Sequence, residues 1–197
     1  MRAVANSTPL MYLSKADALW LLFEVYEDIV IPRAVYREVV VIGFERGFRD
    51  AELVEAAVKE GSIRVEDVPR EEVGRVLRLA PMLHRGEAET LALAMRYKPC
   101  HVLLDDRIAR SVARVLGLEP HGTLYVVFTA AARNLITVSK ALSILDELVK
   151  SGFRISLELY LKIRAELLGL DPSSGAVGDQ ATMIADLEEF GEEHVRK

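Results

Sequence analysis

The chain has 197 residues, of which 51% are hydrophobic and 28% charged, a composition typical of a globular protein with one core of ordinary size. Its formal net charge of −5 argues against a general nucleic-acid-binding surface, because nonspecific affinity for nucleic acids comes from neutralising phosphates. A single cysteine, Cys100, excludes an intrachain disulfide and a cysteine-rich zinc site. No apolar run approaches the roughly 20 residues of a membrane span, and residues 1–6 lack a signal-peptide core, so we expect a cytoplasmic protein without membrane contact.

The first part of the chain predicts short strands that alternate with helices. A short apolar run at 3–5 precedes Asn6-Ser7-Thr8-Pro9, whose cap residues and proline favour a strand-to-helix turn at Asn6. A second strand at 28–31 leads into a helix that opens at Pro32. Glu38 lies at the margin of the apolar stripe of this helix, and a solvated glutamate is the simplest interpretation of it. The next expected elements are a loop at 43–50, a helix at 51–59 and a strand at 63–65.

An acidic segment follows in the middle of the chain. Apolar residues recur at helical spacing after His84-Arg85-Gly86-Glu87-Ala88-Glu89, which predicts a helix that begins near Gly86 with carboxylates in its first turn. The apolar run 100–104 predicts a strand that stops at Asp105 and Asp106, before a helix at 107–116. These aspartates would therefore lie at the carboxyl end of a strand, where open α/β sheets bind their ligands.

The alternation of strands and helices continues to about residue 133 and is the pattern of a parallel sheet with both faces covered. We expect residues 1–133 to form one α/β domain. Residues 134–169 predict a pair of helices packed on that domain as a C-terminal extension. Residues 170–197 predict a linker followed by an acidic helix or tail.

If the strands that end at Asn6 and Asp105 are neighbours, their side chains share a crevice with the glutamates of the acidic segment. Carboxylates crowded in one crevice repel one another unless a cation neutralises them, and oxygen-only clusters suit Mg²⁺ or Mn²⁺. A metal held there could activate a water for attack on a phosphodiester. Spacing alone supports a second interpretation equally well, in which Glu87 merely favours a helix amino end and Asp106 caps the next helix.

Other polar residues near this segment have two interpretations each. Arg107 and Arg110 share one face of a helix, which is either a strip for RNA phosphates or an ordinary solvated face. His84 and His101 flank the acidic helix at a spacing that matches no helical metal site, and we interpret both as exposed loop histidines.

Four segments, in this order, resemble the PIN domain, and more closely its VapC-toxin relatives from archaea and bacteria: Val4 to Leu10, Ile29 to Val39, Arg85-Gly86-Glu87-Ala88-Glu89 and Leu103 to Arg107. The resemblance covers Met1 to about Leu168. It implies a three-layer α/β/α fold with about five parallel strands. It also implies a metal-dependent endoribonuclease that cleaves single-stranded RNA through a metal-activated water, with Mg²⁺ or Mn²⁺ as cofactor, a homodimer as its common state and an antitoxin protein as a possible partner.

Carried over position by position, the resemblance implies a set of oxygen ligands for the metal: Asn6, Glu38, Glu87 and Asp105, with Asp106 beside them. The catalytic acids would be Glu38, Glu87 and Asp105, and the secondary candidates are Glu89 and Ser7. Asn6 departs from the family pattern, which has aspartate there. An amide oxygen ligates a hard cation without adding charge, so the affinity for Mg²⁺ should fall. The alternative function is therefore a catalytically impaired PIN-like protein that serves as an RNA- or protein-binding or assembly module.

Overall fold

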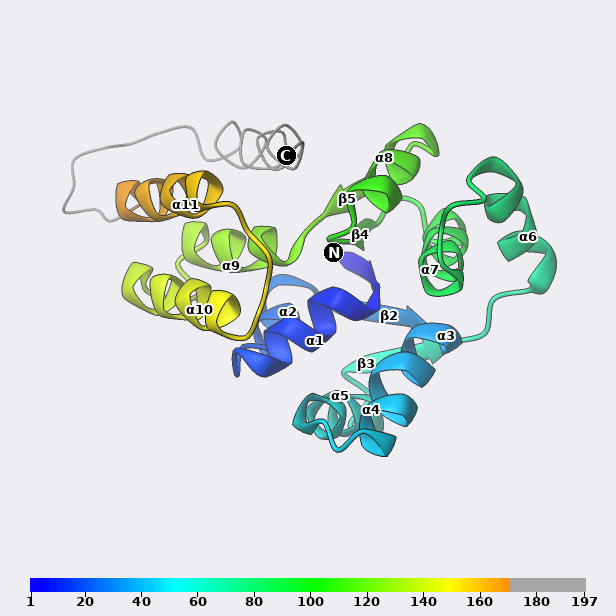
Figure 1. Cartoon of the computed structure of the whole chain (residues 1–197), viewed down its shortest axis with the longest axis horizontal. Coiled ribbons are helices and arrows are strands. Elements are labelled where there is room, and N and C mark those ends of the chain that lie inside the picture. Colours follow the sequence, from blue (N-terminus) through cyan, green and yellow to red (C-terminus); the bar gives the residue numbers. More distant parts are fainter. Residues whose placement is uncertain (171–197) are drawn as a thin grey trace. The chain divides into compact units, whose positions relative to one another are not determined.

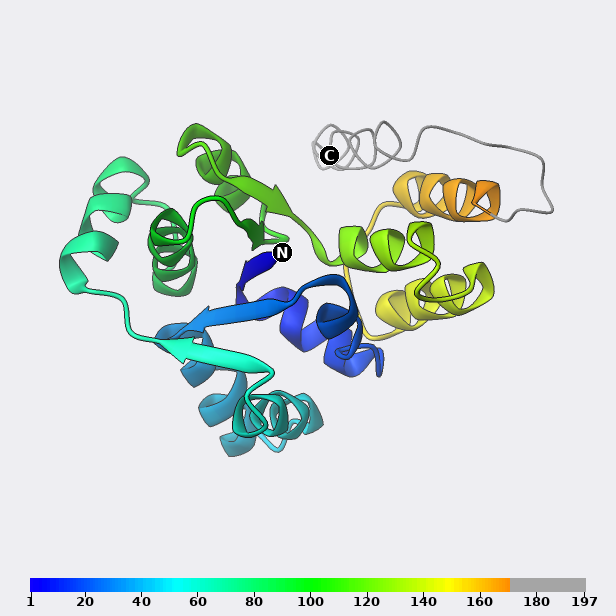
Figure 2. The same ribbon diagram turned by 180° about the vertical axis from the view of Figure 1, so that it is seen from behind.

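The computed structural model of the chain describes residues 1–170, which divide into two compact units, residues 1–123 and the chain from residue 124 onward. The first unit contains a sheet with helices, and the second is helical in its described part. Figures 1 and 2 show both units from opposite sides. The linker and acidic helix expected after residue 170 lie outside the described residues.

The first unit is built on a five-stranded sheet in the order β3-β2-β1-β4-β5, and all four neighbouring pairs are parallel. Its strands are β1 (Arg2–Ala5), β2 (Asp28–Pro32), β3 (Ile63–Glu66), β4 (His101–Leu103) and β5 (Glu119–His121). The chain runs outward from β1 through β2 to β3 and then returns to place β4 on the other side of β1. The order of the strands therefore reverses between β1 and β4. This sheet confirms the expected parallel α/β class.

Helices cover both faces of the sheet and complete three layers. Val4, Val30 and Val102 belong to one buried cluster with the helices that follow β3 and β4, while the alternate residues Ala3 and Leu103 face the other side. The helices of this unit are α1 (Ser7–Lys15), α2 (Leu21–Val25), α3 (Arg33–Tyr36), α4 (Ile42–Glu45), α5 (Arg49–Lys59), α6 (Arg70–Leu79), α7 (Arg85–Arg96) and α8 (Arg107–Val115).

The helix that opens after Pro32 contains an irregular turn. Helices α3 and α4 are joined without a break by a π-helical turn, η1 (Arg37–Val41). A π turn holds one residue more than an α turn, and both Val39 and Val40 in this turn are buried.

The sequence predicted a loop at 43–50, and this prediction is wrong at both ends. The helix continues to Glu45, and α5 already begins at Arg49. A β-carbon built on Gly43 would lie 2.8 Å from Cβ of Ala51, so glycine is what allows α4 and α5 to approach this closely. The connection between them is only a short turn, because the two helices pack directly against each other.

The second unit contains three helices among its described residues: α9, which opens at Thr123 and ends at Ala132, α10 (Val138–Lys150) and α11 (Leu157–Gly169). The hydroxyls of Thr137 and Ser156 cap α10 and α11 by accepting hydrogen bonds from backbone N–H groups. Asp146 of α10 accepts hydrogen bonds from the Tyr160 hydroxyl, at 2.6 Å, and from Nη1 of Arg164, at 3.1 Å, which ties it to α11. None of the helices in the described part of the chain combines the length and apolar character that a bilayer crossing needs.

Candidate active site

Because the strand order reverses between β1 and β4, the turns that follow these two strands lie side by side. Asn6 directly follows β1, and Asp105 and Asp106 follow β4 after one more residue. The strands are in register, with Ala5 opposite Leu103, and the N–H of Asn6 donates to the carbonyl of Leu103 at 3.0 Å. In parallel sheets, the crevice at such a reversal point is where ligands bind. The strands that precede Asn6 and Asp105 are therefore neighbours, as the expected convergence of these side chains requires.

Asn6 and Glu38 meet at the amino end of α7. A β-carbon built on Gly86 would lie 3.5 Å from Oε2 of Glu38 and 3.7 Å from Oδ1 of Asn6, which places both oxygens against the same backbone position. Asn6 is the N-cap residue of α1, yet its side chain makes no capping hydrogen bond. The amide oxygen of Asn6 is thus available to a ligand at the place where the carboxylate of Glu38 arrives.

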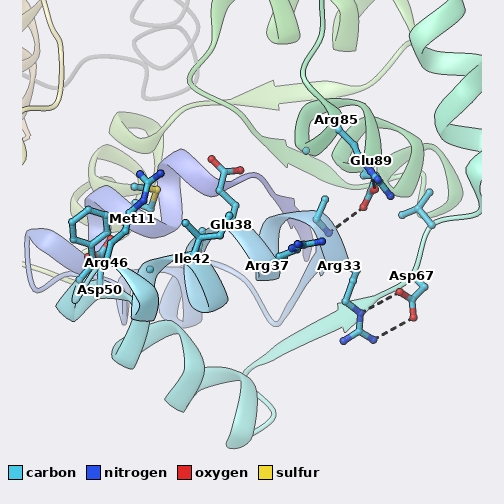
Figure 3. Close-up of a pocket in the computed structure, with 16 residues that line it drawn as sticks. Met11, Arg33, Arg37, Glu38, Ile42, Arg46, Asp50, Asp67, Arg85 and Glu89 are labelled. Atoms are coloured by element: carbon cyan, nitrogen blue, oxygen red, sulfur yellow. Dashed lines mark hydrogen bonds and ion pairs between the residues drawn. The ribbon is translucent and has the colours of Figure 1, made fainter.

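The hydroxyl of Ser7 orients Glu38. Oγ of Ser7 donates to Oε2 of Glu38 at 2.7 Å, and Ser7 itself is 4% exposed. A buried hydroxyl that donates to a carboxylate positions that carboxylate, which fits the secondary role expected for Ser7. Glu38 is exposed and lies on the π turn, and Figure 3 shows its carboxylate extending from the helix. Turns of this kind are frequent at functional sites, because the extra residue re-aims a side chain.

Glu87 and Asp106 lie close enough to each other for their charges to interact. Burial raises the pKa of Glu87, and repulsion from the carboxylates of Asp106 and Glu38 raises it further, against the hydrogen bond that it accepts from the N–H of His84 at 2.8 Å. Oδ1 of Asp106 accepts from the N–H of Ala109 at 2.9 Å and caps α8. Each carboxylate has a second oxygen, so a capping role leaves a lone pair for a cation.

The carboxylate of Asp105 makes a different set of contacts. It accepts hydrogen bonds from the backbone N–H of Thr123, at 2.8 Å, and from the hydroxyl of Thr123, at 2.6 Å. A β-carbon on Gly122 would lie 2.9 Å from Oδ1 of Asp105, so the turn before α9 closes directly over this carboxylate. Burial raises the pKa of Asp105, and the bonds from Thr123 and the charge of Arg110 partly offset that rise. Asp105 therefore anchors the turn that leads to α9, whereas the charge of Asp106 acts on Glu87.

The side chain of Glu89 links α7 to the start of α3. It is 3% exposed and accepts hydrogen bonds from the N–H of Ala34 at 3.1 Å and from Nε of Arg85 at 2.8 Å. Its charge thus stabilises the amino end of α3. Of the two arginines considered for RNA, Arg107 is exposed, while Arg110 lies beside Asp105.

A cavity of about 600 Å³ lies next to Glu38 (Figure 3). Four arginines and four carboxylates contribute to its wall, namely Arg33, Arg37, Arg46, Arg85, Glu38, Asp50, Asp67 and Glu89. Arg33 pairs with Asp67, with Nε 3.1 Å from Oδ1, and Arg85 pairs with Glu89. Within residues 1–170, no hydrogen bond or ion pair engages the side chain of Arg37 or of Arg46. Sequence reasoning missed these two cations, although Arg37 precedes Glu38 directly.

The candidate ligands for a hard cation near the reversal point are Asn6, Glu38, Glu87 and Asp106, because oxygens of Asn6 and Glu38 lie against Gly86 and the charges of Glu38 and Asp106 act on Glu87. In the described part of the chain, the three carboxylates do not bring their oxygens within 4.8 Å of one another. Three carboxylates and one amide form an oxygen-only donor set, which suits ions such as Mg²⁺ and Mn²⁺. Burial is the main cause of the raised pKa of Glu87 and repulsion from Asp106 and Glu38 adds to it, and a bound cation would offset both. The capping interpretation is confirmed for Glu87 and Asp106, while the metal-ligand interpretation stays a prediction that their mutual charge interaction leaves open.

One protein-family model matches the chain, the PIN domain, over residues 2–168. No curated protein and no solved structure matches it significantly. The match spans the whole sheet and the three helices that follow it.

Proposed function

Because the chain belongs to the PIN domain family, whose members are nucleases that generally use divalent metals, we propose that it is a metal-dependent endoribonuclease that cleaves single-stranded RNA. The observation that supports this proposal best is the approach of Asn6 and Glu38 to the amino end of α7, where the charges of Glu38 and Asp106 act on Glu87, beside the point where the strand order reverses. These residues come from four separate segments of the chain, and the fold brings oxygens of Asn6 and Glu38 against the same backbone position.

In this proposal, Glu38, Glu87 and Asp106 hold Mg²⁺ or Mn²⁺, and Asn6 contributes a neutral oxygen. When bound, such an ion supplies a water of lowered pKa and neutralises charge on the phosphate under attack. Ser7 keeps the carboxylate of Glu38 in place through its 2.7 Å hydrogen bond. Asp105 is a positioning residue, because its bonds to Thr123 fix the turn next to Asp106.

The RNA strand is proposed to enter along the cavity next to Glu38. The net charge of the chain is −5, so an RNA-binding path needs local cations. Arg37 and Arg46 supply them, since the other two arginines of the cavity are already paired with carboxylates. Arg107, exposed at the start of α8, remains a further proposed phosphate contact.

The double variant Arg37→Ala/Arg46→Ala is expected to bind single-stranded RNA about tenfold more weakly than the parent. Loss of two phosphate contacts should also reduce the slope of log K against log[salt] by about 1.4, at about 0.7 per contact for single strands. The measurement is fluorescence anisotropy with a labelled RNA in chelator, so that no cleavage occurs. Arg78→Ala removes a cation from α6, outside the cavity, and serves as control. An unchanged salt slope in the double variant would place the RNA path elsewhere.

The function itself is tested by incubating labelled single-stranded RNA with the purified chain in Mn²⁺, in Mg²⁺ and in chelator. We expect internal cleavage only with a divalent ion, and loss of that cleavage in Glu38→Gln, which keeps the size of the side chain and removes its charge. Cleavage that persists in chelator, or in Glu38→Gln, would contradict a metal-activated mechanism. A double-stranded RNA of the same sequence tests the strand preference.

A specific observation favours a second candidate function. Asn6 occupies the position where the family pattern has an acid, so the site has one negative charge fewer for its ion. A chain with so weakened a site would serve as an RNA- or protein-binding or assembly module. The likeness to VapC toxins adds two further proposals, a homodimer and an antitoxin partner, which sedimentation and co-purification would test.

A further inference from the structure

Three potential metal ligands, none of them among the acids described above, gather on the edge of the sheet. His101 opens β4, and Glu119 and His121 begin and end β5. The register pairs His101 with Glu119 and Leu103 with His121. Because side chains alternate along a strand, all three lie on the same face of the sheet, and we call them the edge cluster.

The spacing of the edge cluster fits one metal ion. One ligand atom from each of the three side chains lies within 4.8 Å of the others, and the rings of His101 and His121 have centroids 4.2 Å apart. Nε2 of His101 lies 3.5 Å from Oε2 of Glu119. Two donors that each bind Zn²⁺ at about 2.1 Å with tetrahedral angles lie about 3.4 Å apart, so this pair already has the required separation.

The surroundings of His101 prepare it to bind a metal. Its Nδ1 lies 3.1 Å from the hydroxyl of Tyr26. When Nδ1 carries the proton and donates to Tyr26, Nε2 presents its lone pair toward Glu119, which is the arrangement that supports histidine ligands in metal sites. The sequence interpretation of His101 as an exposed loop residue is wrong, because it is 8% exposed within β4. A fixed, buried ligand thus lies beside a Glu119 side chain that is 72% exposed, through which an ion can enter.

We propose that the edge cluster binds Zn²⁺, or a closely similar first-row transition ion, through His101, Glu119 and His121, with water completing the coordination. Two imidazoles and one carboxylate are a donor set that zinc uses, whereas Mg²⁺ takes oxygen ligands. The site is distinct from the oxygen cluster at the strand reversal, which contains no imidazole. An ion here joins β5 to β4 through side chains and stabilises the edge of the sheet, because only the folded chain brings the three ligands together.

The test uses the full chain, stripped of metal and titrated with Zn²⁺ against a colorimetric chelator, with excess Mg²⁺ present to occupy oxygen-only sites. One Zn²⁺ per chain is expected to bind tightly, and His121→Ala and Glu119→Gln should each weaken that binding at least tenfold. His84→Ala removes a histidine outside the cluster and should leave the affinity unchanged, as should Asp106→Asn. The proposal is overturned if the parent binds no Zn²⁺, or if His84→Ala or Asp106→Asn weakens binding as much as His121→Ala does.

A thermal measurement provides an independent readout. Zn²⁺ is expected to raise the Tm of the parent and of His84→Ala, and to leave the Tm of Glu119→Gln unchanged. Glu119 is exposed, so this variant folds even if the loss of His121 disturbs the chain. A parent whose Tm does not respond to Zn²⁺, or a Glu119→Gln variant whose Tm rises as much as that of the parent, means that His101 and Glu119 form only an ion pair.

Discussion

Asp106→Asn is expected to lower metal-dependent RNA cleavage by about 10²- to 10³-fold, whereas Asp105→Asn should lower it by less than about tenfold. The two aspartates are adjacent, but their contacts differ. The charge of Asp106 acts on Glu87, so its loss removes a ligand from the proposed ion site. The carboxylate of Asp105 is occupied by the N–H and hydroxyl of Thr123, and asparagine keeps one acceptor oxygen for them.

This comparison needs cleavage rates at limiting and at saturating Mn²⁺, together with circular dichroism to show that both variants fold. The two substitutions are isosteric and remove the same charge from neighbouring positions, so each is the control for the other. A folded Asp105→Asn variant that is inactive, beside an active Asp106→Asn variant, would assign the metal-ligand role to Asp105, as the family resemblance implies.

Asn6→Asp is expected to tighten Mn²⁺ binding at least tenfold and to raise the cleavage rate. The new charge appears where Oδ1 of Asn6 already lies, against the same backbone position as Oε2 of Glu38. Attraction to a divalent ion then exceeds 1.4 kcal/mol, which corresponds to about tenfold in affinity. Without an ion, the same charge repels Glu38, so Asn6→Asp should lower the Tm in chelator and raise it in Mn²⁺.

The matched control for this prediction is Asn134→Asp, an exposed exchange of the same kind outside the site. Its φ of 56° is one that aspartate tolerates as well as asparagine, so no strain is introduced. The difference in Tm between Asn134→Asp and the parent should be the same in chelator and in Mn²⁺. If Asn6→Asp changes neither Mn²⁺ affinity nor cleavage, the binding-module function is favoured over the nuclease.

The sheet was predictable because its signals are local. Short apolar runs ending in cap residues or acids mark β1 and β4, and alternation with helices implies parallel strands. The strand limits at 3–5 and 100–104 differ from the observed ones by a residue or two, which is the ordinary fraying of such boundaries. The loop predicted at 43–50 failed because close packing of Gly43 on Ala51 is a tertiary contact, and a glycine followed by charged residues carries no mark of it.

The candidate site was predictable only as a set of residue types. That Thr123 engages Asp105, so that the charge of Asp106 and not of Asp105 acts on Glu87, follows from a contact remote in sequence that no periodicity reveals. The position of Glu38 depends on a π turn within a run of β-branched residues that also fits a regular helix. His101 was assigned to a loop because its partner, Tyr26, comes from a distant segment.

The π turn at Glu38 affects how one continuous helix packs against both β2 and α5. Each α-helical residue advances by about 100°, so one added residue rotates everything after it by that angle. Before the turn, the buried Val35 lies on α3, which contacts β2; after it, Gly43 meets Ala51 of α5. A chain shortened by one residue here would keep one of these alignments and lose the other.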